Sequence, residues 1–252
     1  MADLTIFTSG SHFVLVALIV MLGQIIYTAI GFGSGMVTIS LLALCFGNVN
    51  LYVPFFLLLC LPAELTVFLK DRHHLELGRT ARLLLFIFPG IVLGTLLLKS
   101  APGNSLVLAL GILIVVLAGW FLAGEKQWKP APIHPRWEPV VGAISGVLGG
   151  LYGISGPPLI VYFKARGVDK TVFRVALLTI FLFMTVFRTG TYTVTGLFTV
   201  PILVSTACIL PFSLGGMGIG MVLHDRIPED RFKQITSVVL LLSGVLLIVK
   251  EL

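Results

Sequence analysis

Two short stretches rich in glycine and serine interrupt an otherwise apolar sequence. The first reads GFGSGM, residues Gly31–Met36, and the second reads GISGPP, residues Gly153–Pro158. Each precedes a new apolar run, so we expect a helix to start there, with the serine as N-cap and a proline in the first turn of the second helix. The first N–H groups of a helix lack intrahelical partners and carry partial positive charge, so two such starts with serine hydroxyls predict an anion site. The candidate anion-binding residues of these stretches are Gly33, Ser34, Gly35, Gly153, Ser155, Gly156 and Pro157.

The same glycines also fit a purely structural role. Small residues spaced as in Gly142-x-x-x-Gly146 let two helices approach closely. Two interruptions at equivalent positions of the chain favour a site, because interrupted helices in corresponding halves of a transporter point to its binding site.

Two ionisable residues lie inside apolar segments. Glu64 occurs in LPAELTVF and Arg188 occurs in MTVFRTGTY. Ionisable side chains at membrane depth are costly, which makes both of them functional candidates. We expect Arg188 to face a cavity and attract an anion, and Glu64 to pair with Arg188 or to carry a coupling proton. A structural ion pair, or an arginine whose long side chain reaches the membrane interface, would leave the same pattern.

The composition implies that lipid is the solvent of this chain. Of its 252 residues, 57% are hydrophobic and 11% are charged, whereas soluble domains carry about 25% charged residues. Continuous apolar runs predict helices rather than a barrel of alternating strands. The net charge of +6 does not predict a nucleic-acid partner, because in a membrane protein the placement of basic residues matters more than their sum. We therefore expect an all-α integral membrane protein in contact with membrane lipid.

Eight apolar segments follow one another, and the first and fifth contain the two interruptions. The N-terminal stretch MADLTIFTSGSH lacks the basic residues of a signal peptide, so the first segment is expected to remain in the mature chain. A polar, proline-rich linker, residues 124–139, separates an N-terminal membrane repeat, residues 1–123, from a C-terminal membrane repeat, residues 140–252. The segments are Phe13–Phe46, Leu51–Leu69, Leu83–Leu98, Leu106–Ala123, Val140–Phe163, Val172–Thr195, Leu197–Leu223 and Ile235–Val249.

The basic residues distinguish two topologies. If all eight segments cross the membrane, seven basic residues lie in loops on one side and eight on the other. If the first and fifth segments are hairpins that enter and leave on one side, fourteen lie on one face and only Lys99 and Lys250 on the other. Basic residues concentrate on the cytoplasmic side, which favours the hairpins, although Phe13–Ile30 is long enough to cross alone. The predicted fold is two inverted structural repeats, each a broken helical hairpin followed by three membrane-crossing helices, with both termini outside.

Two motifs of soluble enzymes are nearly present, but each lacks one required glycine. A dinucleotide fingerprint that starts at Gly31 would need glycine at Met36, and a nucleophile elbow around Ser155 would need glycine at Pro157. The segments hold one acid and no histidine in their interior, so we expect no catalytic cluster, no cofactor and no metal site. The RHH stretch, Arg72–His74, is interpreted as a solvated loop rather than as a metal site.

The paired motifs GFGSGMVTISLLAL and GGLYGISGPPLIVYF resemble those of the sulfite exporter TauE/SafE family, and the similarity covers the whole chain. In the first motif, Met36 and Val37 stand close to where many relatives have a proline. The resemblance implies a secondary transporter that exports small sulfur-containing anions, such as sulfite, sulfoacetate or related sulfonates, across the bacterial cytoplasmic membrane. A sulfonate group has three acceptor oxygens, which suits convergent N–H donors and serine hydroxyls.

Alternating access around the two hairpins, with a coupling proton or cation, is the expected mechanism. An anion channel and a non-transporting membrane subunit are the alternatives, and a membrane enzyme is disfavoured by the missing catalytic cluster. The residues specify neither the anion nor the oligomeric state.

Overall fold

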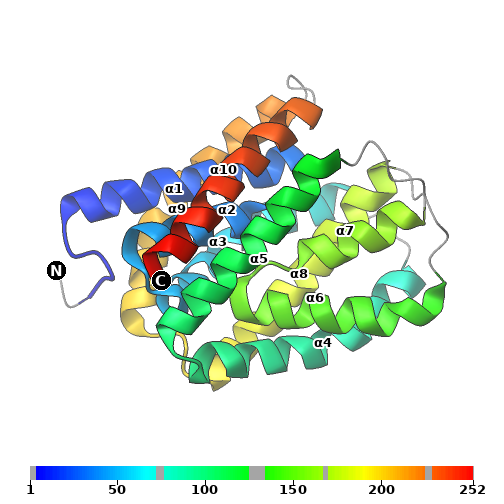
Figure 1. Ribbon diagram of the computed structural model, residues 1–252, viewed down its shortest axis with the longest axis horizontal. Coiled ribbons are helices and arrows are strands. Elements are labelled where there is room, and N and C mark those ends of the chain that lie inside the picture. Colours follow the sequence, from blue (N-terminus) through cyan, green and yellow to red (C-terminus); the bar gives the residue numbers. More distant parts are fainter. Residues whose placement is uncertain (1–3, 72–76, 125–133, 167–169, 225–228, 252) are drawn as a thin grey trace.

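The structure, a computed structural model, describes residues 4–71, 77–124, 134–166, 170–224 and 229–251, and these ranges form ten α-helices and no strand (Figure 1). The predicted apolar segments are confirmed as helices, with the first divided into α1 and α2 and the fifth into α6 and α7. The helices are α1 (Gly10–Ile30), α2 (Ser34–Phe46), α3 (Val49–Asp71), α4 (Leu77–Ser100), α5 (Gly103–Gly124), α6 (Glu138–Tyr152), α7 (Gly156–Ala165), α8 (Lys170–Val194), α9 (Val200–His224) and α10 (Glu229–Glu251), with a 3-10 helix, η3 (Pro135–Trp137), before α6.

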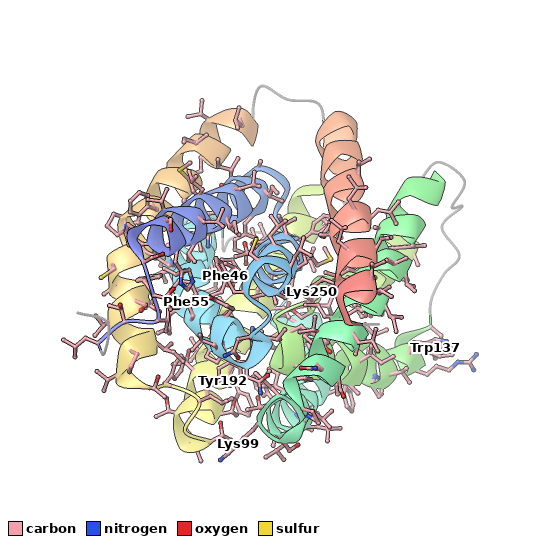
Figure 2. All side chains as sticks on the ribbon, turned by 60° about the vertical axis from the view of Figure 1, so that its left-hand side comes forward. Phe46, Phe55, Lys99, Trp137, Tyr192 and Lys250 are labelled. Carbon is pink, nitrogen blue, oxygen red and sulfur yellow. The ribbon has the colours of Figure 1, made fainter. Side chains whose placement is uncertain are left out.

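The surface of the helix bundle is apolar, as expected for a protein surrounded by lipid. Large apolar side chains point outward from many helices (Figure 2), and Val194 is 89% exposed. Polar groups such as Gln24 and Glu64 are buried instead. Among the described residues, six helices are long and apolar enough to cross a membrane, namely α1, α3, α4, α5, α8 and α9. Together these features confirm an all-α integral membrane protein.

Glycines with positive φ produce both interruptions. Gly31 (φ 93°) ends α1 and Gly33 (φ 94°) is the N-cap of α2, while Gly153 (φ 74°) ends α6. The expectation that Ser34 caps α2 is wrong, because the left-handed backbone at the capping position needs glycine and Ser34 becomes the first helical residue. Ser155 directly precedes α7.

Each interrupted segment folds back on itself. We call α1 and α2 the first hairpin, and α6 and α7 the second hairpin. At the open end of the first hairpin, the rings of His12 and Phe46 lie 4.2 Å apart between their centroids. At the open end of the second hairpin, the Tyr162 hydroxyl donates to Glu138 Oε1 over 2.6 Å. The two helices of each hairpin therefore begin and finish at the same end of the bundle.

The two hairpins enter from opposite ends of the bundle. Near the first hairpin, Asn50 Nδ2 at the start of α3 donates to the carbonyl of Leu98 near the end of α4, over 2.9 Å. Near the start of α4, Arg82 Nε donates to Glu138 Oε2 of the second hairpin over 3.1 Å. At 1.5 Å per residue, these two points of α4 are about 25 Å apart. That the two halves are inverted structural repeats stays a prediction.

The described basic residues separate along the same axis. Lys250 Nζ donates to the carbonyl of Leu44 at the open end of the first hairpin, and Lys99 follows Leu98, which Asn50 binds at the same end. Arg82 and Arg166 both lie beside Glu138, at the opposite end. The hairpin arrangement predicts this separation, while the assignment of each end to a side of the membrane stays a prediction.

The two halves of the chain are packed into each other. Figure 1 shows α1 beside α9, α6 beside α4 and α10 beside α5, so the first helix of each hairpin packs on a helix from the other half. The repeats predicted at residues 1–123 and 140–252 therefore share one interior. Of the predicted linker, residues 125–133 lie outside the described residues, and α6 already begins at Glu138.

Candidate functional site

The tips of the two hairpins touch in the interior of the bundle. A Cβ atom placed on Gly35, in the first turn of α2, would lie 2.6 Å from the carbonyl oxygen of Gly153. A Cβ atom placed on Gly156, at the start of α7, would lie 3.8 Å from Cβ of Phe32. Glycine at position 35 thus lets the first turn of α2 lie against the backbone of the second interruption.

A cavity of about 50 Å³ lies where the tips meet. One water needs at least about 10–15 Å³ and takes a share of about 30 Å³ in the liquid, so this space holds roughly one or two water molecules. All nine residues predicted as site residues from the sequence line it: Gly33, Ser34, Gly35, Glu64, Gly153, Ser155, Gly156, Pro157 and Arg188. Whether they bind a substrate stays a prediction.

Arg188 of α8 is only 7% exposed and lies against the second interruption. A Cβ atom placed on Gly153 would lie 3.4 Å from Nη2 of this arginine. Nη2 donates to the hydroxyl of Tyr192 over 2.9 Å, whereas Nε is buried with no hydrogen-bond partner among the described residues. Burial at this depth excludes the alternative of an arginine that reaches the membrane interface.

Glu64 of α3, 3% exposed, is held by hydroxyl groups rather than by the arginine. Its Oε1 accepts hydrogen bonds from the Tyr27 hydroxyl over 2.9 Å and from Thr185 Oγ1 over 3.1 Å. Its Oε2 has no partner among the described residues. Glu64 and Arg188 share the cavity, but they are not within ion-pair distance, and the ion pairs of the described residues involve Glu138 instead.

The two helix starts at the cavity offer different numbers of donors. The first turn of α2 presents the N–H groups of Ser34, Gly35 and Met36, which the helix itself cannot pair. The first turn of α7 contains Pro157 and Pro158, which have no N–H group. The N–H donors at the start of α7 are therefore those of Gly156 and of Ser155, which precedes the helix.

The charges around the cavity favour an anion. The starts of α2 and α7 carry partial positive charge, while α1 and α6 end in the same two interruptions with partial negative charge. Arg188 lies over Gly153, where its guanidinium offsets the negative end of α6. The positive helix starts are then left to attract a ligand of negative charge.

Four polar residues of the cavity wall are absent from the sequence-based prediction: Tyr27, Cys60, Tyr152 and Thr185. Tyr152 directly precedes the predicted stretch Gly153–Pro158. Thr185 precedes Arg188 by three residues on α8, a spacing that places both side chains on one helix face, and this signal could have found it. Tyr27 and Cys60 lie among apolar residues with no comparable spacing to a charged residue. The RHH stretch, Arg72–His74, lies outside the described residues.

Comparisons with known proteins identify the family of the chain. The model of the family "Sulfite exporter TauE/SafE" matches residues 15–247. A relative from Cupriavidus necator, named "Probable sulfite/organosulfonate exporter TauE", is 30% identical over 175 residues, which are 66% of this chain and 66% of the relative's length. No solved structure matches the chain significantly. Since the family match spans nearly all of a chain built from long apolar helices, the chain belongs to the sulfite exporter TauE/SafE family and is a multi-pass protein of the cell membrane.

Proposed function

We propose that this protein is a secondary transporter that exports small sulfur-containing anions, such as sulfite, sulfoacetate or related sulfonates, through the cavity between the hairpin tips. The observation that carries the proposal is the buried Arg188, whose Nε has no hydrogen-bond partner among the described residues and which lines a cavity that also receives the starts of α2 and α7. Family membership and the printed name of the C. necator relative support the same substrate class.

The way the hairpins are inserted supports a proposal of alternating access. They enter from opposite ends and meet tip to tip, so a tilt of either hairpin would open the cavity toward a different end. At the open ends, His12 Nε2 and the Tyr52 hydroxyl lie 2.9 Å apart near the first hairpin, and Glu138 holds together the second. A hairpin that tilts would have to carry along, or slide on, the helix it packs against, which is α9 for α1 and α4 for α6.

Glu64 is the residue that would take up a coupling proton. Its buried Oε2 has no hydrogen-bond partner among the described residues, and Glu64 lines the cavity together with Arg188. Protonation removes the negative charge that opposes the anion, so proton binding and anion binding strengthen each other, and this coupling is reciprocal.

Counterflow in proteoliposomes tests the proposal. Vesicles loaded with unlabelled sulfite and diluted into labelled sulfite should accumulate label transiently, because a carrier exchanges substrate across the membrane. The Arg188→Gln variant should lose most of this exchange. The exposed Arg136 provides the matched control, since Arg136→Gln removes a guanidinium far from the cavity and should exchange normally.

Two results would contradict the proposal. In the first, no counterflow is seen with sulfite, sulfoacetate or other sulfonates, although cooperative melting in detergent shows that the protein is folded. Alternatively, the vesicles could conduct the anion with no counterflow, which would identify a channel.

A further inference from the structure

We infer that Tyr192 is a positioning residue that sets anion affinity through Arg188. The inference rests on the proposed function, because it concerns the cation of the same cavity. Tyr192 is outside the cavity wall and touches the anion position only through the arginine.

The contacts of Tyr192 leave little freedom to the guanidinium. Tyr192 follows Arg188 by one helical turn on α8 and is completely buried (labelled in Figure 2). Its hydroxyl accepts a hydrogen bond from Nη2 over 2.9 Å, and its ring centroid lies 5.2 Å from Cζ of the arginine. Nη2 is thus fixed, while the buried Nε has no hydrogen-bond partner among the described residues.

The same hydroxyl ties the arginine to the second interruption. Tyr192 donates to the carbonyl oxygen of Gly150 over 2.6 Å, in the last turn of α6. The neighbouring carbonyls accept from the backbone, with Gly153 N–H bound to Gly149 and Ile154 N–H bound to Leu148. The tyrosine therefore satisfies a carbonyl that the end of the helix would otherwise leave unpaired.

Loss of the hydroxyl would redirect the arginine. Without it, both Nη2 and the Gly150 carbonyl lack their partner, and a direct bond between these two groups would satisfy both. Such a bond would pull the guanidinium toward α6 and away from the ligand. An arginine that must first be reoriented binds its ligand more weakly, because fixing its geometry then costs conformational entropy.

The test is a double-mutant cycle in the counterflow assay with sulfite. Tyr192→Phe keeps the ring and removes the hydroxyl, and it should raise the half-saturating sulfite concentration by about ten-fold with a much smaller change in maximal rate. In the Arg188→Gln background, Tyr192→Phe should have no additional effect on half-saturation, because residues that act through one another are not additive. Thr193→Val, which removes an exposed hydroxyl from the adjacent residue, is the control and should leave half-saturation unchanged.

The outcomes separate this inference from the proposed function. Unchanged half-saturation in Tyr192→Phe, or an effect that persists at full size in the Arg188→Gln background, would overturn the role of Tyr192. Unchanged half-saturation in Arg188→Gln alone would instead overturn the anion-binding role of the arginine. If Tyr192→Phe does not yield folded protein, Tyr192→Met removes the same hydroxyl with a flexible side chain and should shift half-saturation in the same direction.

Discussion

The buried side chains of Glu64 and Arg188 are each hydrogen-bonded to hydroxyl groups and not to each other. Glu64 is held by Tyr27 and Thr185, and Arg188 is held by Tyr192. A direct ion pair would have paired both charges, whereas the hydroxyl partners leave Glu64 Oε2 and Arg188 Nε without a hydrogen-bond partner among the described residues. A ligand and a proton can therefore bind without breaking a buried salt bridge, which would cost several kcal/mol.

Replacing Thr185 by valine should weaken the hold on Glu64. The change removes a hydrogen bond to a charged group, worth about 1.5–3 kcal/mol, with little change in shape. We expect a lower melting temperature of the purified protein in detergent and slower counterflow. Thr189→Val is the matched control, since that hydroxyl donates only to the carbonyl of Thr185 on its own helix. If both substitutions lower the melting temperature and the counterflow rate equally, the hydrogen bond to Glu64 contributes no more than a hydroxyl bond within α8.

The Glu64→Gln variant tests proton coupling. Glutamine can still accept from both hydroxyl groups, but it cannot take up a proton. We expect two assays to respond differently to this substitution. Sulfite flux driven by a pH gradient should fall strongly, and sulfite exchange with the same pH on both sides of the membrane should fall at least several-fold less. Flux that responds to the gradient as in the unsubstituted protein would exclude Glu64 as the coupling residue.

Among the elements, pairs of helices from opposite halves make backbone contact through glycine. Gly90 and Gly94 of α4 face Gly146 and Gly150 of α6, and a Cβ atom on Gly146 would lie 2.9 Å from Cα of Gly90. In lipid, where no hydrophobic force joins helices, such close approach of small residues holds them together. The glycines of α6 therefore have a packing role beside the role of Gly153 at the interruption.

Alanine at position 146 should push α6 away from α4. Its methyl group would meet the Ile87 carbonyl, and overpacking of this kind costs about 1–3 kcal/mol. We expect a lower melting temperature and a lower yield of monodisperse protein. Gly190→Ala is the control, because nothing lies within 4 Å of the added atom on α8. If both variants melt alike, the close approach of α4 and α6 does not contribute to stability.

Much of this arrangement of helices was accessible from the sequence. Hydropathy located the helices, and glycine with proline located both interruptions. The capping of α2 was predicted wrongly, because serine is favoured at N-caps in general but this cap adopts positive φ at Gly33. The packing of α1 on α9 could not be predicted, because it depends on contacts far apart in sequence. The bond from Thr185 to Glu64 likewise depends on how α8 faces α3.

For the molecule as a whole, the opposed hairpins determine which residues share a side of the membrane. Arg166 lies beside Glu138 at the open end of the second hairpin, and Lys99 lies at the other end of the bundle. A chain that crossed the membrane fully at α6 and α7 would instead place Arg166 on the same side as Lys99. The position of Arg166 therefore distinguishes the two topologies.

Single cysteines can report this topology. In a background with Cys45, Cys60 and Cys208 replaced by serine, Lys99→Cys should react with a membrane-impermeant maleimide in intact cells. Arg166→Cys should react only after the membrane is permeabilised, as should the exposed Arg136→Cys, the reference for the cytoplasmic side. Labelling of Arg166→Cys in intact cells would refute the hairpin topology.

The contact between Gly35 and Gly153 has a consequence for gene shuffling. Because the two backbones touch, the shape of one interruption limits which residues the other accepts, and Gly35→Ala would collide with the Gly153 carbonyl. A chimaera that joins the first half of this protein to the second half of a relative inherits two interruptions that never adapted to each other. Such hybrids should fail to fold more often than hybrids that receive both interruptions from one parent, and second-site suppressors of Gly35→Ala should cluster at residues 153–156.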